Sequence, residues 1–167
     1  MNQPSEHFRY SSAREKLIEH LFVGELLKTL WLRGDYEAEV LSTEVDAGGY
    51  DVVVELGGVL RHIQLKSSFR GSRTSRQNVH MSLAEKPSGC VIWIQFGARS
   101  LELGPFLWFG DKAGQPLPDI ARFPVAKHTK ANAQGVKTER PRLRVVPRHH
   151  FERLESIDDV VERLFAG

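Results

Sequence analysis

Three polar residues of types that suit phosphodiester hydrolysis lie at the ends of two neighbouring apolar runs in the sequence. Asp51 precedes the first run, and Gln64 and Lys66 close the second. The dipeptide Gly57-Gly58 between the runs predicts a tight β-hairpin, whose second strand returns alongside the first. Because side chains alternate along a strand, Gln64 and Lys66 share one face, while Leu65 points the opposite way. We therefore expect a carboxylate, a carboxamide oxygen and an ammonium group to converge.

This convergence suits hydrolysis with a bound Mg²⁺ ion. The oxygen atoms of Asp51, Gln64 and the Leu65 backbone carbonyl are hard ligands of the kind that Mg²⁺ prefers, with several waters retained. The Lys66 ammonium could orient an attacking water and offset charge that develops on the phosphate. Glu25 lies inside the apolar stripe of a predicted helix and could supply a further metal ligand, directly or through water.

The order of these residues resembles that of a known enzyme family. A helix with Glu25, then Gly49-Tyr50-Asp51, then Gln64-Leu65-Lys66-Ser67-Ser68 is similar to the PD-(D/E)xK, or restriction-endonuclease-like, nuclease superfamily in its Gln-x-Lys variant. The resemblance covers roughly residues 12–96. It implies an α/β fold with a three-layer core, in which helices flank a mixed central β-sheet and 89–96 is a core strand. It also implies cleavage of nucleic acid, usually DNA, with Mg²⁺ or its substitute Mn²⁺.

The family's roles carry over to matching positions, with two departures. Asp51 and Gln64 would be metal ligands, and Lys66 would be the catalytic lysine. Tyr50 stands where the family's name has proline, which does no chemistry. Gln64 replaces an acidic residue, so the site has one negative charge fewer and Glu25 becomes more important. Glu55 is a rival carboxylate on the face of Asp51, although its place near the hairpin tip favours surface exposure.

The sequence thus predicts a metal-dependent endodeoxyribonuclease. The alternative is a catalytically inactive nuclease-fold module that binds nucleic acid or a partner protein. Arg70, Arg73 and Arg76 follow the hairpin and suit contacts to the phosphate backbone, which position a substrate without reading its sequence. A second set of arginines spans 140–148, and such runs are usually solvated surface, with phosphate binding as the alternative. A homodimer and a separate recognition partner are both compatible with these residues.

The elements that would position these residues follow from sequence patterns. Ser12 and Glu15 form a capping-box pattern at the start of an apolar helix that Gly34 ends, and the wide apolar surface of this helix predicts extensive cover. Strands are predicted at 38–45, 50–56, 59–66, 89–96 (a central strand), 107–109, 123–126 and 142–146 (an edge strand). A turn is predicted at 46–49, a mobile arginine-rich loop at 67–78 and a short helical segment at 79–85. The last predicted element is a helix capped by Ser156.

Composition is consistent with one domain over residues 1–167. We expect a flexible tail at 1–10, the core at 12–96, and an extension at 97–167 that ends in a helix at 156–166. No apolar run approaches the roughly 20 residues that cross a bilayer, and the N-terminal residues lack a signal-peptide pattern, so a cytoplasmic location is expected. The net charge of +2 does not by itself indicate nucleic acid. The single cysteine, Cys90, lies in an apolar run and is expected to be buried and inert.

Overall fold

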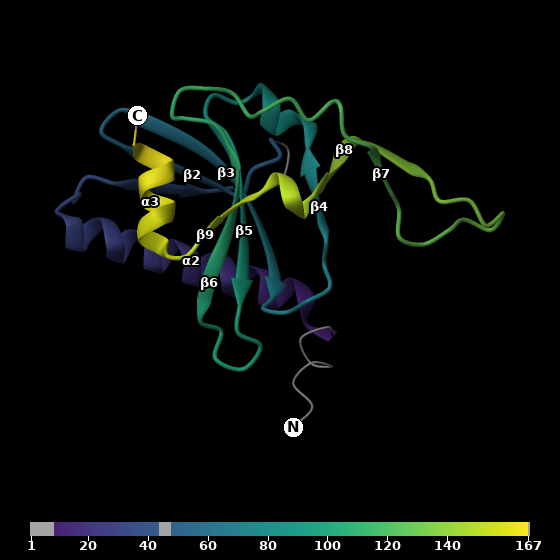
Figure 1. Ribbon diagram of the computed structural model, residues 1–167, viewed down its shortest axis with the longest axis horizontal. Helices are drawn as coiled ribbons and strands as arrows, with labels where there is room; N and C mark the ends of the chain where they lie inside the picture. The colour runs from purple at the N-terminus through teal and green to yellow at the C-terminus, as the bar shows by residue number, and fades with distance from the viewer. Residues whose placement is uncertain (1–8, 44–47, 167) are drawn as a thin grey trace.

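A six-stranded mixed sheet forms the centre of the protein (Figure 1). The computed structural model describes residues 9–43 and 48–166, so most of the expected tail and the 46–47 part of the expected turn lie outside the described residues. Within the described residues the strand order is β1-β2-β3-β5-β6-β9. Neighbouring strands pair antiparallel except β3 and β5, which pair in parallel. The strands are β1 (Glu39–Ser42), β2 (Val52–Leu56), β3 (Val59–Phe69), β5 (Gly89–Phe96), β6 (Leu103–Gly110) and β9 (Glu152–Leu154).

Helix α2 (Ser11–Arg33) crosses one face of this sheet. Its buried apolar residues recur every fourth position, which makes one stripe along the helix: Ile18, Phe22, Leu26 and Leu30. The expected extensive cover of the helix is wrong, because Trp31 and Leu32 on other sides are exposed. The expected capping box is also wrong, because the N-cap is Tyr10, two residues before Ser12, and Tyr10 makes no side-chain cap bond. Gly34 ends the helix as expected, with a left-handed φ of 91°.

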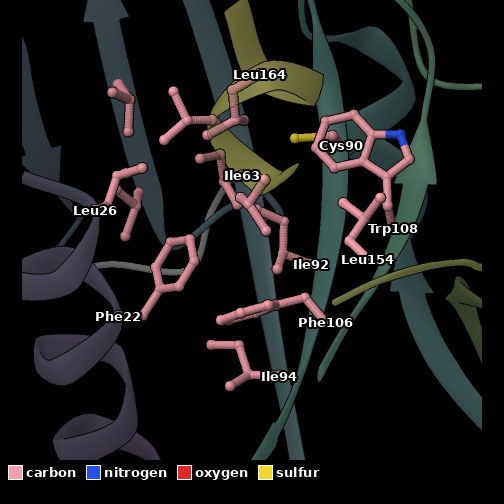
Figure 2. Close-up of a cluster of buried hydrophobic side chains, with 14 of the residues drawn as sticks. Phe22, Leu26, Ile63, Cys90, Ile92, Ile94, Phe106, Trp108, Leu154 and Leu164 are labelled. Carbon is pink, nitrogen blue, oxygen red and sulfur yellow. The ribbon is translucent and has the colours of Figure 1, made fainter. Parts of the chain in front are cut away.

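Helix α3 (Ile157–Phe165) lies on the same face as α2 and completes that side of the core. Ser156 caps it in a full capping box with Asp159, as expected for Ser156. Figure 2 shows Phe22 and Leu26 of α2 and Leu164 of α3 facing the β-strand residues of this cluster. Cys90 is buried there, as expected, and burial raises the pKa of its thiol to about 12. The thiol therefore stays protonated and inert.

Arg61 on β3 fixes the end of α3 from inside the core. Its side chain is fully buried and donates hydrogen bonds to the backbone carbonyls of Leu164 (2.7 Å), Arg163 (3.0 Å) and Asp111 (3.0 Å). A cation is favourable at a helix C-terminus, where the carbonyl groups lack intrahelical partners. Burial lowers the pKa of Arg61, but these carbonyls satisfy its donors.

Strands rather than helices cover the opposite face of the central sheet. A three-stranded sheet of order β4-β8-β7 lies there, with β4 (Arg76–His80), β8 (Glu139–Pro147) and β7 (Val125–Lys127), together with the short helices η1 (Met81–Glu85) and η2 (Arg148–His150). Its core includes Val79, Trp93, Phe109 and Phe123. The α/β fold with a mixed sheet is confirmed. The expected α-helical flank is present on one face, and the small sheet with η1 takes its place on the other.

Three expectations for this region need correction. Half of the predicted mobile loop at 67–78 is strand, because β3 runs on to Phe69 beside β5 and β4 begins at Arg76. The predicted helical segment begins only at Met81. The predicted edge strand at 142–146 is β8, which lies between β4 and β7. The 107–109 and 123–126 predictions correspond to β6, which is longer, and β7.

Candidate active site

A cavity of about 500 Å³ opens between the N-terminal half of α2 and the part of β3 that extends beyond β2. Three of the predicted site residues line it: Asp51, Gln64 and Lys66. Its other lining residues come from four elements and are Ser12, Glu15, Lys16, Ile18, Glu19, Leu65, Ser67, Gln77 and Ile94. The expected convergence at the hairpin is therefore present in the structure.

Asp51 lies where β3 separates from its partner strand. Its backbone N–H donates to the Ile63 carbonyl at 2.8 Å, which ties Asp51 to β3 one residue before β2 begins. Its Oδ2 accepts from the Leu65 backbone N–H at 2.6 Å, which fixes the carboxylate against β3. The N–H and C=O of one strand residue point to the same side, so the Leu65 carbonyl also faces Asp51. This orientation supports the predicted Leu65 oxygen ligand.

The approach to Asp51 depends on a glycine. Gly49 has a left-handed φ of 71°, which glycine adopts at little cost. A Cβ atom at Gly49 would lie 2.7 Å from the His80 Cβ, too close for any other residue. Gly49 therefore lets the chain pass against His80 before it reaches Asp51.

Gln64 and Lys66 point away from Leu65, as strand alternation predicts. Gln64 is only 5% exposed, and its Oε1 accepts from the His80 backbone N–H at 3.3 Å. Only the oxygen of the amide can accept this hydrogen bond, so the contact fixes which end of the Gln64 amide faces His80. The second lone pair of that oxygen can bind another partner. Gln64 and Lys66 also line a second cavity of about 540 Å³ on the β4–β8 side. The two residues therefore lie between the two cavities.

Helix α2 supplies carboxylates from its first turns. Glu15 and Glu19 line the site cavity, and Glu19 is 8% exposed. The Lys16 Nζ lies 2.9 Å from the Glu19 Oε2. The hydrogen bond with Glu19 is the largest cause that raises the pKa of Lys16; burial opposes it, and the negative charge of Asp51 also raises the pKa. Lys16 thus links the α2 carboxylate electrostatically to Asp51.

Glu25 does not line this cavity, which corrects the expectation that it joins the site. It lies six residues beyond Glu19, which is about 9 Å along a helix and about 240° around it. Burial is the main cause that raises the pKa of Glu25; Lys28 lowers it and nearby Glu102 raises it. The missed signal was the polar face of the first turns, where Ser12, Glu15, Lys16 and Glu19 recur at the spacing of one helix face. Glu55 accepts from the Gly58 N–H at the hairpin tip and is not a lining residue either.

The donor set can be tested against the Mg²⁺ ion that the resemblance implies. In the part of the chain that the structure describes, no group of three or more His, Cys, Asp or Glu side chains is arranged to hold a metal ion. The residues that line the cavity do include other carriers of oxygen ligands: Gln64 with its amide and Leu65 with its carbonyl, besides Asp51 and Glu19 with their carboxylates. Oxygen ligands with few protein charges suit Mg²⁺, which keeps several waters. The residues present therefore fit a weak Mg²⁺ site.

The three arginines after the hairpin differ in their surroundings. Arg70 is held by the β5–β6 turn, because its guanidinium donates to the carbonyls of Gly104 and Glu102 and to the Glu102 carboxylate at 3.2 Å. Arg73 and Arg76 are exposed. None of the three lines the site cavity, although Gln77 beside Arg76 does.

Comparison with known proteins adds no family assignment. No protein-family model, curated protein or solved structure shows significant similarity to the chain. Among the described residues, no helix is both long enough and apolar enough to cross a membrane.

Proposed function

We propose that this protein is a Mg²⁺-dependent endonuclease that hydrolyses phosphodiester bonds in DNA. The observation that carries the proposal is the meeting of Asp51, Gln64 and Lys66 from one hairpin with Glu19 from α2 in one cavity. The resemblance of Asp51 and Gln64-Leu65-Lys66 to the PD-(D/E)xK motifs supports the same activity and a restriction-endonuclease-like core. The parallel β3–β5 pair, with α2 packed across it, is consistent with such a core.

The oxygen atoms of Asp51, Gln64, Glu19 and the Leu65 carbonyl would hold the metal. Bound Mg²⁺ would neutralise phosphate charge and lower the pKa of a coordinated water. Asp51 is suited to this role because the Leu65 N–H occupies one carboxylate oxygen and fixes the direction of the other. Gln64 is held in a similar way by the His80 N–H. Such preorganisation reduces the rearrangement that metal binding requires.

Lys66 is the cationic residue that β3 contributes to the cavity. It lies two residues beyond Gln64 on the same strand face, so its ammonium reaches the region where a phosphate would meet the oxygen donors. A fixed cation at this point orients an attacking water and offsets negative charge on the phosphate in the transition state.

Plasmid nicking tests the proposal. Supercoiled DNA with Mg²⁺ or Mn²⁺ should be nicked by the wild type and not after EDTA is added. Asp51→Asn and Lys66→Met should each lower the rate by on the order of 10²-fold or more, the usual cost of removing one preorganised group. Glu55→Gln is the matched control, because Glu55 is a carboxylate of the same hairpin outside the cavity. Equal nicking by Lys66→Met and the wild type would contradict the role of Lys66.

The second candidate is a binding module that holds nucleic acid without cutting it. One observation favours it: Lys16 already neutralises Glu19 beside Asp51, as a metal ion would. A module predicts salt-sensitive DNA binding that ignores Mg²⁺ and survives Asp51→Asn. An enzyme predicts instead a rise in melting temperature with Mg²⁺ or Mn²⁺ that is lost in Asp51→Asn. Absence of both nicking and this thermal shift in folded protein would favour the module.

A further inference from the structure

Strands β7 and β8 continue into a hairpin that projects from the body of the protein (Figure 1). We call residues 127–142 the arm. Every residue of the arm is exposed. Because its residues are exposed, the arm adds nothing to either hydrophobic core. An isolated two-stranded hairpin is also only marginally stable. The arm therefore needs an explanation other than packing.

The arm is nevertheless an ordered structure. His128 donates its backbone N–H to the Thr138 carbonyl at 2.9 Å, which joins the two sides of the hairpin. At the tip, the Asn132 side chain accepts from the backbone N–H groups of Gln134 (3.0 Å) and Val136 (2.9 Å). At its base, β8 pairs with both β7 and β4. The arm is thus a hairpin with regular β pairing at its base, where Lys127 pairs with Glu139, and with hydrogen bonds across the loop at 128–138.

The charge of the arm is strongly one-sided. It carries five basic residues, Lys127, Lys130, Lys137, Arg140 and Arg142, against one acidic residue, Glu139. The whole chain has a net charge of only +2, so positive charge is concentrated here. A basic segment outside the core is the electrostatic pattern of contact with phosphate groups.

The base of the arm adjoins the candidate active site. The second cavity is lined on one side by Gln64 and Lys66 and on the other by Arg140, Arg142 and His128. A nucleic acid with one phosphate at Lys66 would therefore bring its neighbouring phosphates toward the arm. The arm and the site would then contact the same strand.

We propose that the arm lies in the major groove of duplex DNA and holds that duplex over the site. This inference rests on the proposed function for its substrate class and names the duplex as the form that is bound. The two sides of the arm leave its base as paired strands, which lie about 4.8 Å apart, and the major groove, about 12 Å wide, admits two chain segments side by side. The lysines of the arm then contact phosphates on both sides of the groove. A-form RNA has a deep, narrow major groove that excludes such a pair of segments.

Fluorescence anisotropy with a labelled DNA duplex of about 30 base pairs, three helical turns, tests the inference. The full chain is titrated in EDTA across a range of salt concentrations, so that binding is measured without cleavage. The test variant is Lys127→Ala/Lys130→Ala/Lys137→Ala, whose three residues line neither cavity. We expect its affinity to fall at least tenfold and its log–log salt slope to shrink by about two to three, one unit for each lost phosphate contact.

The matched control is Lys28→Ala/Arg99→Ala/Lys112→Ala, which removes the same charge from exposed positions outside the arm. It should retain most of the wild-type affinity. Equal losses of DNA affinity in both triple variants would overturn the inference about the arm, because they would show only a general effect of net charge. Wild-type binding to duplex RNA as tight as to duplex DNA, or an equal loss on single-stranded DNA, would overturn groove binding.

The two proposals fail in distinguishable ways. If the wild type nicks plasmid and the arm variant binds as tightly as the wild type, the arm inference is wrong and the nuclease proposal stands. If the wild type neither binds nor nicks DNA, the nuclease proposal is wrong and the arm inference is overturned with it. Tight, arm-dependent duplex binding without nicking supports the arm inference and contradicts the nuclease proposal.

Discussion

Glu19 and Lys16 place an ion pair beside Asp51 in the candidate site. A buried carboxylate is costly unless it is paired or binds a cation. Lys16 meets that need in the structure, and Mg²⁺ would meet it in a metal-bound state. The buried α2 carboxylate in the site is therefore Glu19, whereas Glu15 also lines the cavity but is exposed, and Glu25 does not line it.

A pair of isosteric substitutions separates these two carboxylates. Glu19→Gln should lower the nicking rate by on the order of 10²-fold and raise the Mg²⁺ concentration needed for half-maximal rate, since it removes a negative charge from the donor set. Glu25→Gln should leave both quantities within about twofold, because Glu25 lies about 9 Å further along the helix. Nicking by purified variants over a Mg²⁺ titration measures both effects. The reverse pattern, with Glu25→Gln inactive, would contradict the assignment.

The site residues on the hairpin could be predicted from the sequence, but the α2 carboxylate that meets them could not. Asp51, Gln64 and Lys66 follow from strand alternation and a two-glycine turn, which fix the faces and the register within one hairpin. Which carboxylate of α2 meets them depends on how the helix crosses the sheet. That angle is set by packing of Phe22 and its neighbours, which no local pattern records.

At the scale of elements, β3 shows how pairing overrides local composition. Residues 67–69 follow a polar pattern that predicts a loop, yet they pair in parallel with Ile94 to Phe96 of β5. Ser68 is compatible with the strand because it accepts hydrogen bonds from the side chains of Trp93 (2.8 Å) and Gln95 (2.9 Å). Strand preference depends on such neighbours more than on the residue itself. The extra length of β3 beyond β2 creates the cavity edge beside Asp51.

The capping box of α3 predicts a pH dependence of stability. The backbone N–H of Ser156 donates to the Asp159 Oδ2 at 3.0 Å, and hydrogen bonds with Ser156 hold the pKa of Asp159 below its usual value. A carboxylate with a lowered folded-state pKa stabilises the fold above its unfolded pKa, about 3.9, and this contribution is lost as pH falls through the folded value. Asp159→Asn should therefore be less stable than wild type at neutral pH, and the difference should shrink as pH falls from about 4 through the lowered pKa of Asp159. Urea unfolding at a series of pH values measures the difference; a gap that persists at low pH would exclude the charge as its cause.

At the scale of the whole molecule, one sheet supports two different covers. The α2 and α3 face was predictable from helical spacing. The other face is closed by β4, β8 and the segment with Leu117, Ile120 and Phe123, which lacks a periodic pattern. Apolar residues spread through a Gly- and Pro-rich stretch predict only an excursion, because their partners lie far away in the sequence. The same excursion carries both buried core residues and the exposed arm.

This division of the excursion makes a final prediction about stability. Replacing residues 128–138 by Asn-Gly, a two-residue hairpin turn, should change the free energy of unfolding by less than about 1 kcal/mol, since exposed residues contribute little and a shorter loop costs slightly less to close. Leu117→Ala, in the same excursion but 4% exposed, should cost about 2–5 kcal/mol. Urea denaturation of the two variants beside the wild type makes the comparison. A loss in the shortened variant as large as that of Leu117→Ala would mean that the arm packs on the body. The arm would then be part of the fold, and it could not enter a DNA groove without partial unfolding.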